Sequence, residues 1–437
     1  MKRIAYLLGI STLFLTIGLS LNFSLTGCSK SKSDKSSSAQ TGSGGLKKGG
    51  TIRYLMTSDP SSLNPFVSSG IPQSEVLAYV HESLLGRNID TNEYIPGLAK
   101  EWKVSEDKMS FSFTLRDNAF WSDGKPVTMD DVVFSFKALF DNKYAMLSRV
   151  RNYVENIKEF TVEGNTITFK AKEKYFKNFD AAASGYWEVY PKHIYEDVEK
   201  AKKIVNTAVG SGPFVINKYE RGKQIVLTRN PKWWGWKDPN YAEQLNFDRV
   251  IFRIFGGERI KGLELMKKGV GDFLELSPEE YVVKTKGDVW RKNTEKIKTN
   301  IKRPMPYGYI GWNLTNPKFK DKKVRRALAM LMNRQEMVKK YRYSLSEPAT
   351  GPWFRKSPFA NPEVKAIPFD PKAALALLRE AGWKDSDKNG IVDKVVDGKK
   401  IELSFTIHFA SKEHEKYLTW YQDCLLYTSD AADESTC

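Results

Sequence analysis

Apolar residues alternate with polar ones along several short segments of the chain. Residues 109–116 alternate strictly, with four large apolar side chains on one face. Because successive side chains of a strand point to opposite faces, this period of two predicts a half-buried strand. The same alternation predicts strands at residues 51–56 and 224–230, and a hairpin over 160–172 whose two runs meet at Gly164-Asn165.

Other segments place apolar residues three or four positions apart, which is the spacing of one helix face. This pattern predicts helices at residues 74–85, 128–140, 322–341 and 370–382. Short strands and helices therefore alternate through the chain, and this order is typical of the α/β or α+β class. A chain of 437 residues with 41% hydrophobic residues exceeds one compact domain, so we expect at least two.

Two of these helices carry clear signals at their ends. The helix at 128–140 opens with Thr128 and has Asp131 three residues later, which is the spacing of a capping box. The helix at 370–382 has Asp370 to cap its start, a proline in the first turn and Gly382 at the position where helices often end.

The N-terminus has the features of a secretory signal peptide. Lys2 and Arg3 precede an apolar, uncharged run over residues 4–25. The alternative is a transmembrane anchor, because about 20 apolar residues span a bilayer. We favour a signal peptide over residues 1–27 because Leu25-Thr26-Gly27-Cys28 resembles a bacterial lipobox. That resemblance implies that Cys28 carries lipid, whose acyl chains hold the protein on the membrane.

The segment that follows is rich in Ser, Gly and Lys and has no apolar pattern. Residues 28–49 are therefore predicted to be a lipidated, flexible tether. The formal net charge is +17, but both signs are scattered and no run of five basic residues occurs. We interpret the charge as a solvated basic surface and expect no nucleic-acid partner. Between Cys28 and Cys424 there is no cysteine, which excludes disulfides and cysteine zinc sites within that segment.

Signatures of common enzymes and metal sites are absent or incomplete. The sequence has no G-x-S-x-G motif and no P-loop, and its four histidines form no zinc-protease helix. Residues 385–393 imitate the first half of a calcium-binding loop, but position twelve is Val396 rather than Glu. We therefore predict an acidic surface turn, no metal, no cofactor and no enzymatic activity. The tryptophans of residues 233–236 are expected to pack in the interior.

Four segments in order along the chain resemble the family 5 extracellular solute-binding proteins of ABC importers. They are residues 113–139 with their aromatic-Ser-Asp-Gly turn, 210–235 with Gly-Ser-Gly-Pro, 312–338, and 369–383. The resemblance implies an α/β, two-lobed periplasmic-binding-protein fold of type II topology, with a small extra domain inserted in the first lobe. The lobes are expected to close by hinge motion around a ligand in the cleft between them.

The resemblance also implies a domain plan and a function. The first lobe is expected over residues 50–312, with the inserted subdomain at about 75–190, and a partial second lobe over 313–423. A monomer would capture peptides and deliver them to ABC permease subunits. It would stand on the periplasmic or extracytoplasmic face, anchored by lipid to the cell membrane or the outer membrane. Nickel-chelate, haem, an oligosaccharide or a signalling peptide are alternative ligands, and a secreted hydrolase or an adhesin is the alternative class.

Candidate ligand contacts follow from the resemblance. Family members place backbone contacts just after the first strand, which corresponds to Ser69, Gly70 and Ile71; the alternative is an ordinary surface turn. An aromatic residue that lines the cleft in family members corresponds to Tyr309. Tyr307, Trp312 and Trp353 are further candidates of the same kind. Their alternative role is packing within a buried core.

The C-terminal residues 424–437 do not continue the family pattern. A strand at 401–409 and a helix from Ser411 are expected to be followed by more second-lobe structure. Instead the chain continues into CLLYTSDAADE, which resembles the translation of a sequencing adapter. We therefore expect a non-native tail and an incomplete second lobe; a natural, divergent C-terminus is the alternative. The acidic residue that holds a peptide's amino terminus would then lie in the missing part.

Overall fold

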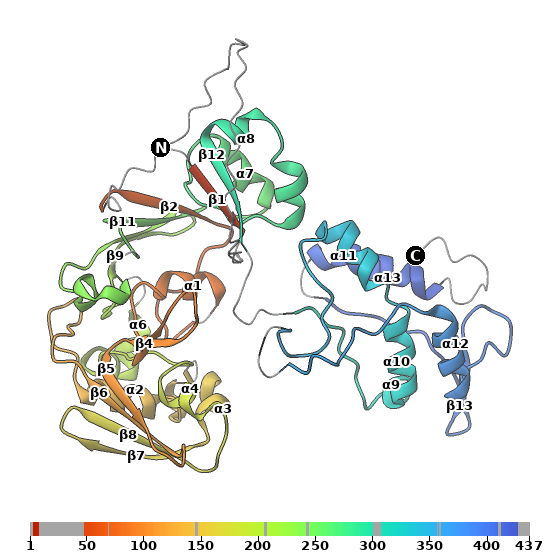
Figure 1. Ribbon diagram of the computed structural model, residues 1–437, viewed down its shortest axis with the longest axis horizontal. Coiled ribbons are helices and arrows are strands. Elements are labelled where there is room, and N and C mark those ends of the chain that lie inside the picture. The colour runs from red at the N-terminus through yellow and green to blue at the C-terminus, as the bar shows by residue number, and fades with distance from the viewer. Residues whose placement is uncertain are drawn as a thin grey trace, which may run out of the picture. The chain divides into compact units, whose positions relative to one another are not determined.

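The structure is a computed structural model that describes residues 3–7, 48–68, 70–144, 147–204, 208–241, 244–299, 307–355, 357, 360–409 and 412–426. The chain divides into two compact units. Unit 1 comprises residues 1–6, 11–275 and 292–297, and unit 2 comprises residues 7–10, 276–291 and 298–437. In Figure 1 most of unit 1 is coloured from orange to green and most of unit 2 from cyan to blue. The predicted lobe boundaries stay predictions.

The first sheet of unit 1 has the strand order β2-β11-β10-β9. Its strands are β2 (Thr51–Met56), β9 (Phe214–Glu220), β10 (Gln224–Arg229) and β11 (Arg249–Ile254). β2 and β11 run parallel, whereas β9, β10 and β11 are antiparallel neighbours. The helix α1 (Ile71–Leu77) contributes Val76 and Leu77 to the same buried cluster as Ile225 and Leu227 of β10. The helix α7 (Arg259–Lys267) follows β11 in the chain.

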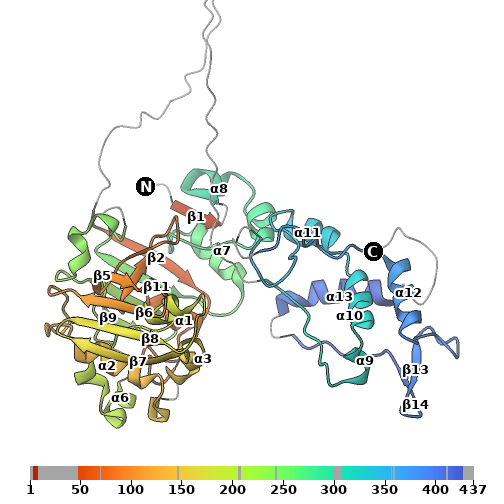
Figure 2. The same ribbon diagram turned by 60° about the horizontal axis from the view of Figure 1, so that its bottom comes forward.

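The second sheet of unit 1 is antiparallel, with the order β5-β6-β8-β7 (Figure 2). Its strands are β5 (Ala99–Val104), β6 (Ser110–Leu115), β7 (Ile157–Glu163) and β8 (Thr166–Ala171). Around it lie the hairpin β3 (Leu85–Arg87) and β4 (Tyr94–Pro96), and the helices α2 (Met129–Ala138), α3 (Arg151–Val154), α4 (Asn178–Ala182), α5 (Lys192–Tyr195) and α6 (Val198–Lys203). The Phe136 ring of α2 packs 4.9 Å from the Phe169 ring of β8, measured between centroids.

Most predicted elements of unit 1 are confirmed. The strands at 51–56, 109–116 and 224–230 and the hairpin at 160–172 are β2, β6, β10 and β7–β8. The helix predicted over 74–85 is wrong in its second half, because α1 ends at Leu77 and residues 85–87 form β3. Leu84 is fully buried, but in a different cluster from Val76, so its apolar spacing reflects tertiary packing rather than a continuous helix face.

Unit 2 is mainly helical in its described residues. It contains α9 (Pro317–Lys320), α10 (Lys322–Met330), α11 (Arg334–Arg342), α12 (Pro371–Glu380), α13 (Glu415–Leu426) and the hairpin β13 (Asp393–Val396) with β14 (Lys399–Glu402). Its core gathers Val324 and Leu328 of α10, Leu378 of α12, Trp383, and Tyr421 of α13. The Tyr421 hydroxyl donates to the Leu328 carbonyl oxygen at 2.7 Å, which ties α13 to α10.

Two predictions for unit 2 need correction. The single helix predicted over 322–341 is two helices, because the Asn333 side chain accepts from the Glu336 backbone N–H at 3.2 Å and starts α11 anew. The strand predicted over 401–409 extends only to Glu402 in β14. The helix predicted over 370–382 is confirmed as α12, with Asp370 accepting from the Ala373 backbone N–H at 2.9 Å.

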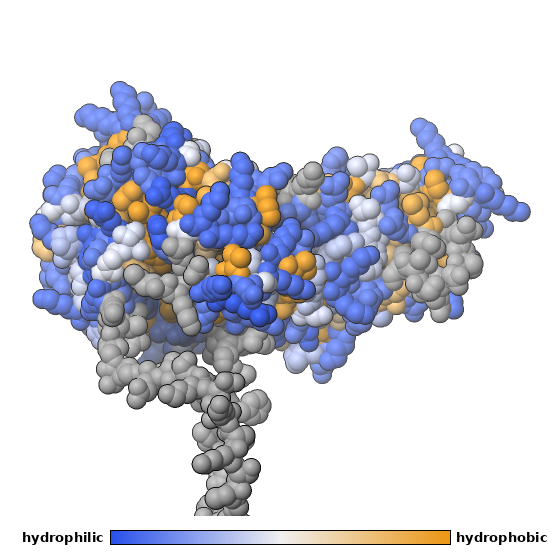
Figure 3. All heavy atoms as spheres, turned by 90° about the horizontal axis from the view of Figure 1, so that it is seen from above, coloured by the Kyte–Doolittle hydropathy of each residue, from blue (hydrophilic) through white to orange (hydrophobic). Residues whose placement is uncertain are grey.

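The structure describes only parts of the two segments predicted at the chain ends. β1 (Arg3–Leu7) lies within the predicted signal peptide and pairs with β12 (Thr294–Lys298), which follows α8 (Asp288–Asn293). Cys28 and residues 427–437 lie outside the described residues, whereas residues 424–426, where the predicted foreign tail begins, form the end of α13. Lipidation and the foreign tail stay predictions. None of the helices in the described ranges has the length and apolar composition that a membrane span requires. Polar residues cover most of the face in Figure 3, and apolar residues form small patches on it.

Candidate functional site

The first predicted contact segment is an accessible stretch of backbone at the start of α1. Ser69 lies outside the described residues. Gly70 is extended, with φ 173° and ψ 164°, and a Cβ placed on it would meet only Pro72 Cδ, at 3.9 Å. Ile71 exposes 76% of its surface. Neither the backbone conformation nor a neighbouring atom requires glycine at position 70. Because glycine has no side chain, the backbone there is open to close approach.

Side-chain hydrogen bonds hold the segment that leads into Gly70. Ser68 Oγ donates to Gln73 Oε1 at 2.8 Å and lies 2.7 Å from Ser61 Oγ. Earlier in the loop, Asn64 Nδ2 donates to the carbonyl oxygens of Ala201 and Ile204 at 2.6 and 2.9 Å. The segment is therefore fixed on both sides of Gly70. Sequence reasoning missed the Asn64 hydrogen bonds because their partners lie 137 and 140 positions away.

The predicted aromatic residues of unit 2 fall into two groups. Tyr309 exposes 79% of its surface and Tyr307 exposes 43%, and their ring centroids are 5.7 Å apart. Trp353 is also exposed. Trp312 is half-buried, and its ring centroid lies 4.7 Å from that of Phe319 and 5.4 Å from that of Phe405. The alternative of core packing therefore fits Trp312, whereas the two tyrosines present free aromatic surface.

A buried carboxyl group lies at the centre of the tryptophan cluster in unit 1. Trp233 and Trp234 are buried, as predicted, and their Nε1–H groups donate to Glu82 Oε1 at 2.9 and 3.0 Å. Burial raises the pKa of Glu82 to about 7, against the opposing effect of the indole hydrogen bonds and the positive charge of Arg116. The Arg116 guanidinium lies 3.4 Å from the centre of the Trp234 ring. Because both indole rings are buried and hydrogen-bonded to Glu82, we interpret this cluster as structural.

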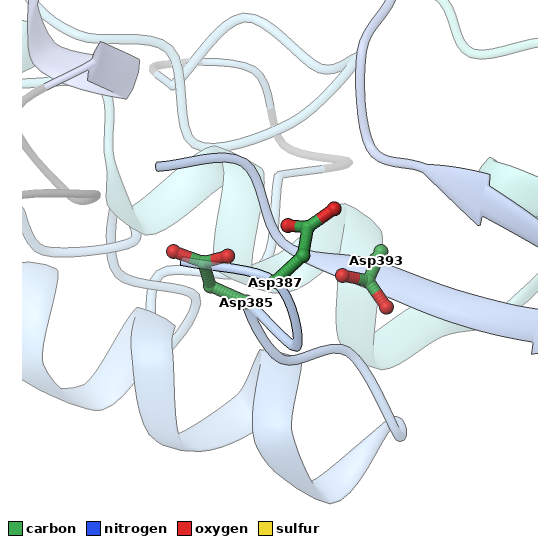
Figure 4. Close-up of side chains that lie close together, drawn as sticks. All are labelled: Asp385, Asp387 and Asp393. Atoms are coloured by element: carbon green, nitrogen blue, oxygen red, sulfur yellow. The ribbon is translucent and has the colours of Figure 1, made fainter. Parts of the chain in front are cut away.

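The acidic turn of unit 2 is paired with a lysine side chain, Lys400. Ligand oxygens of Asp385, Asp387 and Asp393 lie within 4.8 Å of one another (Figure 4). Lys400 Nζ lies 2.6 Å from Asp387 and 3.4 Å from Asp393. The pKa of Asp387 is lowered chiefly by its hydrogen bond from Lys400, and that of Asp393 by hydrogen bonds from Ser386. Asp393 is buried and Asp387 is exposed, so the predicted turn lies only partly at the surface. The ammonium group supplies the positive charge that a metal would bring.

Comparisons with known proteins identify relatives over most of the chain. A probable ABC transporter-binding protein of Deinococcus radiodurans is 28% identical over 87% of this chain and 67% of its own length. The oligopeptide-binding protein AppA of Bacillus subtilis is 27% identical over 94% of this chain and 74% of its own length. The chain thus spans about two thirds to three quarters of these two relatives. It spans about half of several Brucella binding proteins that it also matches.

Solved structures share the mixed α/β fold. The structure of AppA from Bacillus subtilis in complex with a nonapeptide superposes with a TM-score of 0.66 at 22% identity, covering 88% of this chain and 73% of that one. NikZ from Campylobacter jejuni in complex with Ni(L-His) gives 0.62 at 23% identity, covering 80% and 66%.

A match to a family model shows which protein family the chain belongs to. The model of the bacterial extracellular solute-binding proteins, family 5 Middle, matches residues 93–425, which is most of the chain. This match includes all four segments on which the resemblance was based. The chain therefore belongs to the family 5 bacterial extracellular solute-binding proteins, which are non-enzymatic, substrate-binding components of ABC import systems.

Proposed function

We propose that the ligand of this solute-binding protein is a peptide. The observation that carries the proposal is the similarity to AppA, a protein named for binding oligopeptides, over 94% of this chain. A dipeptide-binding protein of Escherichia coli is also 25% identical over 76% of the chain. Nickel complexes are the competing ligand class, because NikZ, which has the same fold, was solved with Ni(L-His).

Two features of the described residues support peptide binding. The extended backbone at Gly70 and the exposed Ile71 suit main-chain pairing with an extended peptide, which does not depend on the peptide's side chains. Tyr307 and Tyr309 offer exposed rings that can cover apolar side chains and still form hydrogen bonds. We assign ligand contacts to Ser69, Gly70, Ile71, Tyr307 and Tyr309, keep Trp353 as a further candidate, and assign Trp312 to packing.

Hinge closure, a lipid anchor and a flexible tether would together serve the transport cycle. We infer a fold of type II topology in which a small domain is inserted in the first lobe and the lobes close on the ligand by hinge motion. Cys28 carries the lipid that holds the mature, monomeric protein on the periplasmic or extracytoplasmic face of the cell membrane or the outer membrane. From there the tether over residues 28–49 lets the protein deliver its peptide to the permease subunits.

A thermal-shift experiment on the full chain distinguishes the candidate ligands. Pools of peptides of two to nine residues should raise the melting temperature in a saturable way, whereas Ni(L-His) should not. Recovery of the peptides intact at the end of the experiment would exclude a hydrolase. A shift with the nickel complex and none with any peptide pool would overturn the peptide assignment while leaving the family membership intact.

A further inference from the structure

Unit 1 contains an open cavity of about 490 Å³ at one end of its first sheet. Three pieces of chain form it: the turn between β9 and β10, the end of β11, and α7 with the residues after it. α7 lies beyond the ends of β2 and β11 in both ribbon views (Figures 1 and 2). The cavity residues are Gly222, Lys223, Arg253, Ile254, Phe255, Ile260, Lys261, Glu264, Leu265, Lys268 and Val270. None of them belongs to the predicted peptide contacts.

Positive charge dominates this cavity. Four of its residues are basic and one, Glu264, is acidic. The carboxylate of Glu264 is already paired with Lys267 at 2.6 Å, and Lys223 is paired with Glu220 at 3.2 Å. Three cations remain, Arg253, Lys261 and Lys268, and within the described part of the chain none of them has a carboxylate partner.

Arg253 is the most informative of the three. Its side chain is half-buried, and its Nε atom is buried without a hydrogen-bond partner among the described residues. A buried donor that stays unpaired costs about 1–3 kcal/mol, and more when it belongs to a charged group. An anion in the cavity would offset the repulsion among the three cations and the cost of burying part of the Arg253 guanidinium group.

The lining also indicates what kind of anion fits. A phosphate group carries a charge of about −1.5 to −2 near neutral pH and three acceptor oxygens, which suits three cations better than a carboxylate does. Phe255, Ile260, Leu265 and Val270 supply apolar surface beside the charged groups. We propose that this cavity binds the phosphate group of an organic phosphate ester. A soluble phosphomonoester and a phospholipid headgroup share this chemistry.

Calorimetric titration of the full chain with glycerol 3-phosphate at low ionic strength tests the proposal. We expect saturable binding at one site per chain, and no such binding of acetate. The double variant Arg253→Gln/Lys261→Gln should bind roughly tenfold more weakly, because it removes two charged donors. Glu264→Gln should bind more tightly, because the acidic residue of the lining is lost. Absence of saturable binding to the parent chain would overturn the proposal.

A matched control separates the cavity from the general basic charge of the protein. Lys103→Gln/Lys172→Gln removes the same two charges from exposed positions at the second sheet of unit 1, on β5 and just after β8. This control should bind glycerol 3-phosphate as the parent does, and an equal loss in both double variants would contradict the assignment. Vesicles with and without phosphatidic acid identify the source. Binding that requires phosphatidic acid and is weakened only in the Arg253→Gln/Lys261→Gln variant indicates a lipid headgroup.

Discussion

Glu82 and Trp233 are joined by a partly buried hydrogen bond in which the indole Nε1–H donates to Glu82 Oε1 at 2.9 Å. Burial raises the pKa of this carboxyl group to about 7, from 4.5 for an exposed glutamate. Between these two values the folded state holds more protons than the unfolded state, so stability falls as the pH rises from 4.5 to 7. Above pH 7 the contribution is constant.

Glu82→Gln should remove this pH dependence, because an amide oxygen still accepts from Trp233 and does not ionise. Relative to the parent, the variant should gain about 3 kcal/mol of unfolding free energy between pH 4.5 and pH 8. Urea unfolding followed by tryptophan fluorescence at several pH values measures the difference. A difference that stays constant across this range would show that Glu82 titrates normally.

His81 should have the opposite effect on stability. Its ring is buried, neither ring nitrogen has a hydrogen-bond partner among the described residues, and burial lowers its pKa to about 3. The unfolded state therefore holds more protons between pH 3 and 6.5, and stability falls as the pH drops through that range. His81→Leu should be less sensitive to acid than the parent in unfolding experiments at pH 4 to 7. An unchanged acid profile would contradict the buried, neutral state of His81.

Replacement of Trp312 and of Tyr309 should separate packing from binding. Trp312 contacts Phe319 and Phe405, so Trp312→Ala should destabilise unit 2 by about 3 kcal/mol. Tyr309 is largely exposed, so Tyr309→Ala should leave the melting temperature unchanged and weaken peptide binding several-fold. Tyr153→Ala, at another exposed tyrosine, is the matched control. Loss of peptide binding in a stable Trp312→Ala variant would return Trp312 to the ligand site.

The cap of α12 should make a measurable contribution to the stability of unit 2. Asp370→Ala removes the side-chain acceptor of the Ala373 N–H and should cost about 1 kcal/mol of unfolding free energy. Glu363→Ala, which removes an exposed carboxylate outside the helices, should cost little. Equal losses in both variants would mean that the effect is one of charge rather than of capping.

Calcium should not stabilise the acidic turn. Because Lys400 already lies against Asp387 and Asp393, millimolar calcium and a chelator should give the same melting temperature. Lys400→Met should lower the melting temperature, since it leaves three neighbouring carboxylates without their cation. A calcium-dependent rise in the melting temperature of the parent chain would contradict this interpretation.

Local sequence patterns predicted the elements that local interactions determine. The alternation at 109–116 and the capping residues Thr128 and Asp370 correspond directly to β6, α2 and α12. The pattern failed where tertiary packing decides, as at Leu84, whose burial extended an apparent helix past its true end at Leu77. It also failed at Asn333, whose capping hydrogen bond interrupts a pattern that continues on both sides.

The candidate site was only partly predictable for a similar reason. Family resemblance indicated Gly70 and Tyr309, but it could not separate Tyr309 from Trp312, since exposure depends on partners such as Phe405 that lie far along the chain. Glu82 and the basic cavity around Arg253 gave no sequence signal. Charged residues such as these usually lie at the surface. Only the fold shows that the Glu82 carboxyl group is buried and that the basic residues around Arg253 line one cavity.

The most direct test of peptide capture is a calorimetric titration of the full chain with a nine-residue peptide selected from the pools that shift the melting temperature. We predict saturable binding of one peptide per chain, weakened in Tyr309→Ala and unchanged in Tyr153→Ala. Saturable binding of Ni(L-His) with no heat from any peptide would contradict this prediction.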